Sequence, residues 1–451
     1  MTTKTSNTTE HAPNSSQAVS GFGLLRSIGR LLLGVIALLL LVLVVTPVVL
    51  LLFVTSVPLF VAIGLLTLDV GFVFALFRAE RTLFTIVGAA VGFVAVSIVA
   101  VYASQVFAST PPIAAPGSIA TLEQVELNGS QQWVTIRGHS TDLPVLLFLA
   151  GGPGGSELAM TRKYLDDLEE HFIIVNWDQP GTGKSYSAVP FDELTPERYV
   201  EDGYALVQHL RERFQQEKIY IFGESWGSIL GAWLVQQHPD LFHAFVSTGQ
   251  MVAPVENDIL MYEFAVEQAV AQGRTGTLEQ LRRNGPPPYT SSQLIGRFGT
   301  MNAVVDGYMG AHAHGEGTGH NLFFDSMGAP EYGLVDKVTW ALGLARTFTT
   351  VYPQIYDVDL RTQIPRLDVP VYFIVGRWDR NAIPELAEEY FNMLEAPHKE
   401  FFWFENSAHT PMWDEPARFL DVMVNTVLAQ TQPPAPDTST YSGYFDARID
   451  G

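Results

Sequence analysis

The first residue that could do chemistry is Ser225, at the centre of the pentapeptide Gly-Glu-Ser-Trp-Gly, residues 223–227. A short apolar run, 219–222, precedes the pentapeptide, and a helix-compatible stretch, 228–238, follows it. A serine between two glycines, on a turn from strand to helix, is typical of a nucleophile held on a tight turn. The turn places the hydroxyl at a helix N-terminus, where free N–H groups favour developing negative charge.

An aspartate and a histidine later in the chain could activate this serine. Asp379 follows the apolar run 371–375, and His409 follows the run 400–404. The order serine, aspartate, histidine, with each residue just past a strand, is that of the α/β-hydrolase catalytic triad. In such a triad the histidine takes the serine proton, and the aspartate holds the imidazole in the productive tautomer. We therefore predict Ser225, Asp379 and His409 as the catalytic residues.

The same chemistry needs two backbone N–H groups that bind the oxyanion of the intermediate. One is expected from Trp226, the residue after the nucleophile. The other is expected from the loop after the third strand, which reads Ala-Gly-Gly-Pro-Gly-Gly at residues 150–155. Glycines let a backbone turn its N–H groups into a pocket, and Gly152 is the predicted second donor.

Strands and helices alternate around these residues. Short apolar runs predict strands at 122–127, 131–137, 145–149, 172–175, 218–222, 244–247, 371–375 and 400–404, and helical patterns occupy 156–170, 195–216 and 415–428. Such alternation indicates a mostly parallel sheet flanked by helices on both faces. The sequence therefore predicts an α/β-hydrolase fold, with its core in residues 118–250 and 362–430, a helical cap insertion in 251–361 and a flexible tail in 431–451.

The N-terminal quarter of the chain has a different composition. Residues 1–26 begin with a Thr-, Ser- and Asn-rich stretch and are predicted to be disordered. Region 27–108 contains three apolar blocks, each long enough to cross a bilayer core, which takes about 20 residues: 31–54, 57–77 and 82–108. Arginines precede the first block and separate the second from the third, so all of them lie on the same face of the membrane if the three blocks cross it. Positive residues favour the cytoplasmic face, and that face is therefore predicted to be cytoplasmic. Everything after the linker 109–117 is then expected outside the cytoplasm of a multi-pass cell-membrane protein, with the lipid bilayer as a partner.

Composition and spacing exclude several other chemistries. The formal net charge of −21 argues against nucleic acid as a partner, because such proteins need a basic surface. The absence of cysteine removes disulfides, thiolate metal sites and cysteine nucleophiles. Residues 183–185, Gly-Lys-Ser, do not form a phosphate loop, because Asp178 stands where that motif needs glycine. The histidine run 312–320 lacks the helical i,i+4 pair typical of a zinc site, so no metal or cofactor is expected.

Four motifs resemble those of the proline iminopeptidase-type α/β-hydrolases: Gly-Gly-Pro-Gly at 151–154, Asn-Trp-Asp-Gln-Pro-Gly-Thr-Gly-Lys-Ser at 176–185, Gly-x-Ser-Trp-Gly at 223–227 and Ser-Ala-His at 407–409. The resemblance covers about residues 118–430. The chain departs from the family at Ala150, where histidine is usual, and at Pro180, where arginine is usual.

The resemblance implies removal of an N-terminal residue, often proline, through an acyl-enzyme. It also implies that glutamates in the cap bind the free α-amino group of the substrate, and the candidates are Glu256, Glu263 and Glu316. Four aromatic residues of the cap either line the substrate pocket or pack the interior of the lid: Trp340, Phe348, Tyr352 and Tyr356.

The expected protein is therefore a membrane-anchored serine hydrolase, with aminopeptidase activity on short peptides as the leading hypothesis. An esterase or lipase-like hydrolase of small acyl esters is the alternative enzyme. A non-catalytic membrane protein that binds peptides is the alternative from another class.

Overall fold

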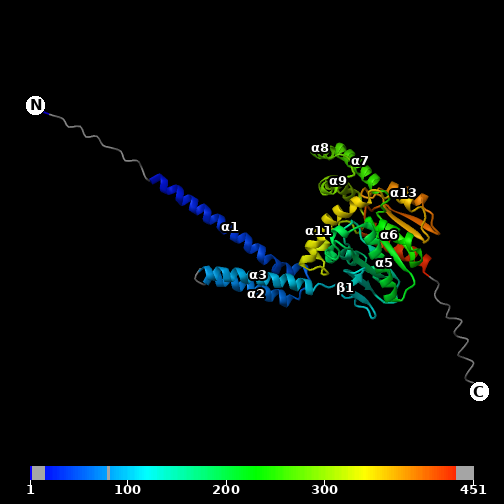
Figure 1. Cartoon of the computed structure of the whole chain (residues 1–451), viewed down its shortest axis with the longest axis horizontal. Helices are drawn as coiled ribbons and strands as arrows, with labels where there is room; N and C mark the ends of the chain where they lie inside the picture. Colours follow the sequence, from blue (N-terminus) through cyan, green and yellow to red (C-terminus); the bar gives the residue numbers. More distant parts are fainter. Residues whose placement is uncertain (3–15, 79–81, 433–451) are drawn as a thin grey trace, which may run out of the picture. The chain divides into compact units, whose positions relative to one another are not determined.

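The computed structural model of the chain describes residues 1–2, 16–78 and 82–432 (Figure 1). These residues form two compact units. The first holds the described residues up to Phe53 together with Val57–Ala103, and the second holds Val54–Ser56 with the described residues from Ser104 onward. The first unit is helical, and every described strand belongs to the second.

The first unit is built from α1 (Ser16–Val54), α2 (Leu59–Arg78) and most of α3 (Leu83–Val106). Within the described residues, two stretches are long and apolar enough to cross a membrane, Leu59–Leu76 and Phe84–Val106. Helix α1 contributes a shorter apolar stretch, Leu38–Val54. The predicted count of three spans is therefore not confirmed, and two is the number that length and composition support.

Helix α1 begins at Ser16, so the structure differs from the predicted disorder of residues 1–26 in the second half of that segment. Once an apolar block has formed a helix, each further residue adds a hydrogen bond without a new nucleation step. Residues 16–26 can therefore extend the helix despite their mixed composition. Residues 3–15, and the predicted tail from residue 433, lie outside the described residues.

The second unit is organised around a sheet of eight described strands in the order β1-β2-β4-β3-β5-β6-β7-β8. The strands are β1 (Ile119–Leu127), β2 (Ser130–Gly138), β3 (Val145–Leu149), β4 (Ile173–Asp178), β5 (Ile219–Glu224), β6 (Phe242–Thr248), β7 (Val371–Gly376) and β8 (Lys399–Phe404). Strand β2 pairs antiparallel with β1 and β4, and all other neighbours are parallel. The predicted strands and the mostly parallel sheet are confirmed.

Strand β3 illustrates why the sheet is covered on both faces. Its residues alternate between two apolar layers, with Val145, Leu147 and Leu149 in one and Leu146 and Phe148 in the other. The first layer is completed by helices α5 (Pro196–Phe214), α6 (Trp226–Gln237) and α13 (Pro384–Met393). The second is completed by α4 (Leu158–Tyr164), α14 (Pro411–Asp414), α15 (Pro416–Asp421) and a π-helix (Val422–Leu428). The short α16 (Ala429–Thr431), which follows, has no buried residue.

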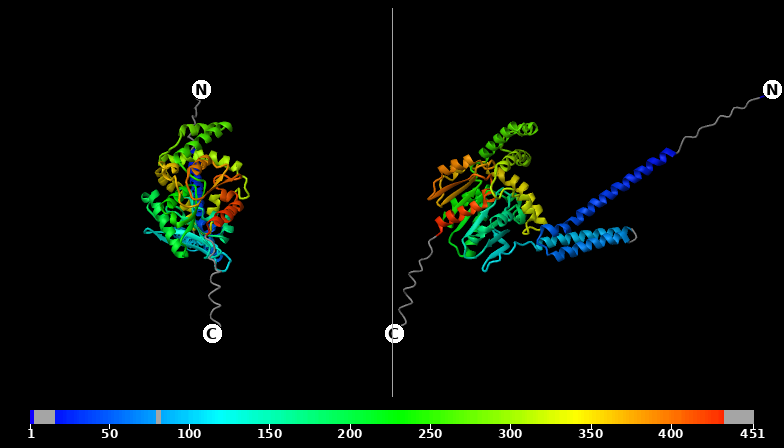
Figure 2. Two further views of the ribbon diagram at one scale, coloured as in Figure 1. Left: turned by 90° about the vertical axis from the view of Figure 1, so that its right-hand side faces the viewer. Right: turned by 180° about the vertical axis from the view of Figure 1, so that it is seen from behind.

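Between β6 and β7 the chain leaves the sheet for residues 249–370, which we call the inserted segment. It contains α7 (Pro254–Ala271), α8 (Thr275–Asn284), α9 (Ser291–His312), α10 (Leu322–Gly328), α11 (Leu334–Val351) and α12 (Leu360–Gln363). Helices α7 to α9, green in Figures 1 and 2, stand off from the sheet in every view.

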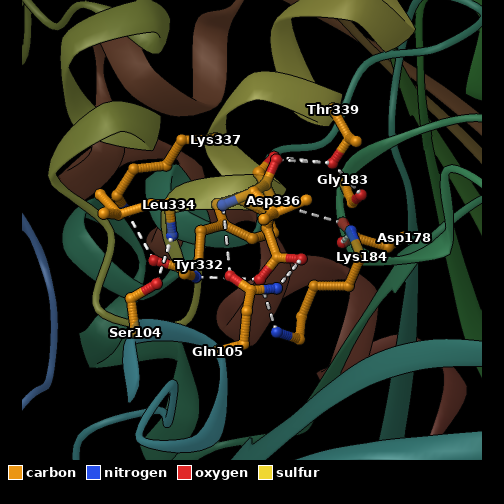
Figure 3. A network of polar contacts seen from close by, with 12 residues as sticks. Ser104, Gln105, Asp178, Gly183, Lys184, Tyr332, Leu334, Asp336, Lys337 and Thr339 are labelled. Carbon is orange, nitrogen blue, oxygen red and sulfur yellow. Dashed lines mark hydrogen bonds and ion pairs between the residues drawn. The ribbon is translucent and has the colours of Figure 1, made fainter. Parts of the chain in front are cut away.

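A polar network holds the start of α11 against the end of β4 (Figure 3). Asp178 accepts hydrogen bonds from the hydroxyls of Ser156 (2.5 Å) and Tyr332 (2.7 Å) and from the backbone N–H of Lys184 (2.8 Å). The ammonium of Lys184 lies 2.7 Å from the carboxylate of Asp336, near the start of α11. The lysine of the Gly-Lys-Ser sequence, Lys184, is therefore engaged in an ion pair with Asp336.

The last residues of α3, which belong to the second unit, complete this network (Figure 3). The hydroxyl of Ser104 accepts a hydrogen bond from the backbone N–H of Leu334 (2.9 Å), and the amide of Gln105 donates to Asp336 (2.9 Å). These contacts satisfy polar groups at the first turn of α11, where backbone N–H groups lack helical partners.

The turn from β5 to α6 is closely packed against the end of β3. A Cβ atom on Gly227 would overlap the carbonyl oxygen of Leu149, and one on Gly223 would overlap the carbonyl oxygen of Gly227. Both obstacles are backbone atoms and cannot rotate away. Glycine is therefore required at both positions, as the sequence predicted.

We predict that Gly227→Ala lowers the free energy of unfolding by about 1–3 kcal/mol, the usual cost of overfilling a packed interior. Gly296→Ala is the matched control, because nothing lies within 4 Å of a Cβ atom at that position of α9. Alanine in a helix interior is favoured over glycine by up to about 1 kcal/mol, so the control should be neutral or stabilising. Unfolding of the full chain, followed by tryptophan fluorescence, measures both; equal midpoints for the two variants would contradict the prediction.

Candidate functional site

Ser225 lies between β5 and α6 with φ of 52° and ψ of −116°. A positive φ is uncommon for a residue with a side chain and persists only where the surroundings enforce it. Here the surroundings include the hydrogen bond from the N–H of Ser225 to the carbonyl of Thr248 (3.1 Å) and the tight glycine packing on both sides. The serine is thus held in a strained conformation at the start of α6.

Asp379 and His409 meet at the carboxyl ends of β7 and β8. The imidazole Nδ1 of His409 lies 2.9 Å from Oδ2 of Asp379. The other oxygen of Asp379 accepts the backbone N–H groups of Asn381 (2.8 Å) and Ala382 (3.0 Å), and the side chain is 1% exposed. The aspartate is therefore fixed from one side while it orients the imidazole from the other.

Ser225 and His409 line one cavity of about 120 Å³, together with Gly152 and Trp226. Among the described residues no hydrogen bond joins the hydroxyl of Ser225 to His409; the imidazole Nε2 lies instead 3.4 Å from Oε1 of Glu224. A larger depression of about 460 Å³ lies elsewhere on the second unit and contains none of these residues. The smaller cavity is the candidate site because the reactive groups line it.

Gln179 joins the loops that carry the two predicted oxyanion donors. Its amide nitrogen donates to the carbonyl of Ala150 (3.3 Å), and its amide oxygen accepts from the indole N–H of Trp226 (3.0 Å). The glutamine of the motif at residues 176–185 therefore ties the glycine-rich loop to the serine turn. This contact explains how residues 150–155 are held beside Ser225.

The inserted segment provides the other wall of the cavity. Its lining is mostly apolar and includes Phe298, Phe348, Tyr352 and Ile355. Of the four aromatic residues singled out in the sequence, Phe348 and Tyr352 line the cavity, whereas Trp340 and Tyr356 are absent from its lining.

Asp258 of α7 is the carboxylate in that lining. It is 1% exposed and accepts a hydrogen bond from the hydroxyl of Tyr352 (2.9 Å). Burial raises the pKa of Asp258 to about 7, although the hydrogen bond from Tyr352 opposes the rise. A cationic group of a ligand next to this carboxylate would favour its ionised form.

The glutamates predicted to bind an α-amino group lie elsewhere. Glu256 is exposed and paired with Arg361. Glu263 is exposed, and Glu316 is exposed and accepts the backbone N–H of Ala417 (3.2 Å). The structure brings none of the three into the lining of the cavity.

A helical pattern in the sequence could have identified Asp258. The buried side of α7 reads Pro254, Asn257, Asp258, Met261, Ala265 and Ala269. An aspartate within an otherwise largely apolar helix face is unusual, because burial of an unpaired carboxylate is costly. No comparable sequence pattern indicates the two further carboxyl groups near His409, those of Glu157 and Glu224.

The histidines of the run 312–320 have other contacts. The ring of His312 stacks on Tyr308 at 4.0 Å, and His320 lies 3.3 Å from the hydroxyl of Thr410. Over residues 16–78 and 82–432, no group of three or more histidine, aspartate and glutamate side chains is placed to hold a metal ion.

The buried Asp258 should make stability depend on pH. Because its pKa is higher in the folded chain, the folded state binds the proton more tightly, and stability falls as pH rises from about 4 to about 7. At high pH this loss is on the order of 4 kcal/mol. We predict that Asp258→Asn removes this contribution and is more stable than the wild type above pH 7. Chemical denaturation at a series of pH values tests this; Asp357→Asn, at an exposed position, should keep the wild-type slope.

Comparisons with known proteins agree with this geometry. A family model described as the alpha/beta hydrolase fold matches residues 144–284. The probable aminopeptidase YbaC of Bacillus subtilis is 32% identical over 309 residues, which cover 68% of this chain and 96% of that protein. The proline iminopeptidase of Heyndrickxia coagulans is 23% identical over 291 residues, which cover 62% of this chain and 88% of that protein.

Two solved structures share the fold. The proline iminopeptidase of Mycobacterium smegmatis aligns with a TM-score of 0.50 at 18% identity and covers 69% of this chain and 99% of that one. A proline iminopeptidase-related protein of Thermus thermophilus aligns with a TM-score of 0.50 at 21% identity and covers 69% and 98%. The family model, the extent of the Bacillus match and the shared fold lead to one assignment: the chain belongs to the proline iminopeptidase-like α/β-hydrolases and is a hydrolytic enzyme.

Proposed function

We propose that this enzyme is a serine hydrolase that acts as an aminopeptidase, releasing N-terminal residues from short peptides through an acyl-enzyme. One observation carries the proposal: Ser225, His409 and the buried carboxyl of Asp258 line the same small cavity. A nucleophile, its base and a group able to bind an ammonium are thus close together. The names of the relatives, an aminopeptidase and proline iminopeptidases, support the same activity.

In the proposed reaction, Ser225 attacks the first peptide carbonyl and transfers its proton to His409, which gives it to the departing amine as the C–N bond breaks. Water deprotonated by His409 then cleaves the acyl-enzyme, releases the N-terminal residue and restores Ser225. Asp379 keeps the imidazole in the tautomer with Nε2 free and stabilises its cation, since it faces Nδ1 at 2.9 Å. The backbone N–H groups of Trp226 and Gly152 bind the oxyanion. Nε2 must move from Glu224 towards the serine, and catalytic hydrogen bonds commonly form fully only in the substrate complex.

The proposed substrate is a peptide that begins with a small apolar residue, including proline. The inserted segment acts as a cap, since Phe298, Phe348 and Tyr352 form an apolar wall around a cavity of about 120 Å³. The α-ammonium of the substrate would pair with Asp258. In this proposal Asp258 takes the role that the sequence suggested for Glu256, Glu263 or Glu316.

An esterase of small acyl esters is the second candidate. The mostly apolar lining that would hold a side chain would also hold an acyl group. A non-catalytic peptide-binding role has less support, because a peptide-binding protein has no need of a serine held with φ of 52° between two obligatory glycines.

We also propose that the enzyme is anchored in the cell membrane. Leu59–Leu76 and Phe84–Val106 have the length and composition of spans, and the first apolar block, 31–54, is the proposed third. The arginines beside these blocks would then face the cytoplasm and leave the catalytic unit outside.

A substrate panel tests the peptidase activity. The wild type should cleave aminoacyl anilides at least about tenfold faster than their N-blocked forms, because a blocked amine cannot pair with Asp258. Ser225→Ala should lose at least about a thousandfold in kcat, since the nucleophile is gone. Asp258→Asn should raise KM for the free amine and not for the blocked form. Equal rates on free and blocked substrates would favour the esterase.

A pair of reporter fusions tests the orientation. Alkaline phosphatase fused after Gly451 should be active, because that enzyme folds only outside the cytoplasm, whereas the same reporter after Arg81 should be silent. The reverse pattern would place the catalytic unit in the cytoplasm.

A further inference from the structure

Two buried glutamates meet beside His409, behind the lining of the cavity. Glu224 is the last residue of β5 and Glu157 directly precedes α4; they are 3% and 6% exposed. Their carboxyl groups are close enough to interact with each other and with the backbone of Gly151, against which the Glu224 carboxyl packs. Oε2 of each glutamate has no hydrogen-bond partner among the described residues. The proposed reaction assigns no role to either side chain.

Such a pair cannot be fully ionised near neutral pH. Two carboxylates in contact repel each other, and burial removes the water that would stabilise the second charge. Burial and the neighbouring Glu157 raise the pKa of Glu224 well above its usual value. Burial also raises the pKa of Glu157, but contact with Glu224 and the charge of His409 oppose that rise. The shared proton is therefore expected on Glu224, directed at Glu157, and the one negative charge of the pair on Glu157.

The negative charge of the glutamate pair lies on the Nε2 side of the imidazole, and Nε2 is the atom that must receive the serine proton. Nε2 of His409 is 3.4 Å from Oε1 of Glu224, whereas Asp379 binds Nδ1 on the opposite side. Glu157 makes no ion pair with His409 in the described part of the chain, so its charge acts from farther away. A proton moved from Glu224 to Glu157 would bring the negative charge directly to Nε2.

Several other carboxyl groups lie near the imidazole. Besides the pair, Asp379 follows β7, Asp258 of α7 lines the same cavity, and the exposed Asp306 of α9 contributes a further negative charge. Burial by itself lowers the pKa of His409, but the charges of Asp379, Glu157 and Asp306 and the hydrogen bond to Asp379 raise it above its usual value. Among the described residues, no lysine or arginine forms an ion pair with Glu157 or Glu224 to offset their charge.

We propose that Glu224 is a positioning residue for His409, and that the proton it shares with Glu157 keeps the negative charge of the pair away from Nε2. With the proton on Glu224, the imidazole is free to turn to Ser225. Without it, Glu224 would hold a protonated imidazole at Nε2, out of reach of the serine. The proposal rests on the proposed serine-hydrolase chemistry and is independent of the peptide or ester preference.

Two isosteric variants separate the two positions of the charge. In Glu224→Gln the neutral amide replaces a protonated carboxyl and the charge stays on Glu157, so the pH at which His409 loses its proton should stay close to that of the wild type. In Glu157→Gln the new amide donates to Glu224 and stabilises its ionised form, so the charge lies next to Nε2 and His409 should keep its proton to higher pH. This shift should be about one pH unit, as expected for a charge gained within about 4–6 Å.

Two readouts on the full-length protein measure the pH midpoint at which His409 loses its proton. The first is the rate at which an uncharged fluorophosphonate labels Ser225 as a function of pH. The second is the rate at which diethyl pyrocarbonate modifies His409, followed by peptide mass spectrometry, which reports the neutral imidazole without any need for serine chemistry. Thermal unfolding of each variant shows whether it is folded, and Glu279→Gln on the exposed side of α8 is the control that should keep the wild-type midpoint.

A raised His409 midpoint in Glu157→Gln together with a near wild-type midpoint in Glu224→Gln supports the proposal. A lowered midpoint in Glu224→Gln would place the negative charge on Glu224 in the wild type and overturn it, and an unchanged midpoint in a folded Glu157→Gln would leave the pair with a packing role. If the wild-type serine is not labelled while the His409 midpoint still rises in Glu157→Gln alone, the pair is supported and the proposed hydrolase function is refuted. If labelling occurs without this rise, only the inference about the pair fails.

Discussion

Helix α6 starts so close to the end of β3 that the carbonyl of Leu149 fills the space a side chain on Gly227 would need. This contact brings the turn that carries Ser225 against the glycine-rich loop, and Gln179 then links that loop to Trp226. The positions of the nucleophile and of the proposed oxyanion donors all follow from it. Because the obstacles are backbone atoms, no repacking of side chains could create the same arrangement around larger residues.

The second feature of the site is the number of carboxyl groups buried around one imidazole. Asp379, Glu157, Glu224 and Asp258 are each no more than 6% exposed, and removing them from water costs free energy. Two backbone N–H groups stabilise Asp379, whereas in the proposed arrangement Glu157 and Glu224 share one proton, since burial and the neighbouring Glu157 raise the pKa of Glu224. Natural proteins accept such costs mainly where a site needs a group with a perturbed pKa. The buried carboxyl groups around His409 are therefore better explained by a role in the reaction than by a contribution to the stability of the fold.

The secondary structure around the sheet was predictable because its signals are local. Each parallel strand is a short apolar run, and Thr195, the first residue of the predicted helical stretch 195–216, caps α5 one residue before a proline. The boundaries of the N-terminal helices were less predictable. A long apolar segment shows where a helix can exist but not where it ends, so α1 extends back to Ser16, into a segment predicted to be disordered.

The sequence by itself determined the sheet, the strained serine turn and the chain order of Ser225, Asp379 and His409, because each depends on a few neighbouring residues. Only the tertiary structure decided which carboxyl groups surround them. Asp258 is buried against Tyr352, 94 residues away along the chain, and Glu157 meets Glu224 only because α4 and β5 converge there. A carboxyl group looks the same in a sequence whether it faces water or another carboxyl group. Its chemistry is set by burial and by its neighbours, and both depend on long-range packing.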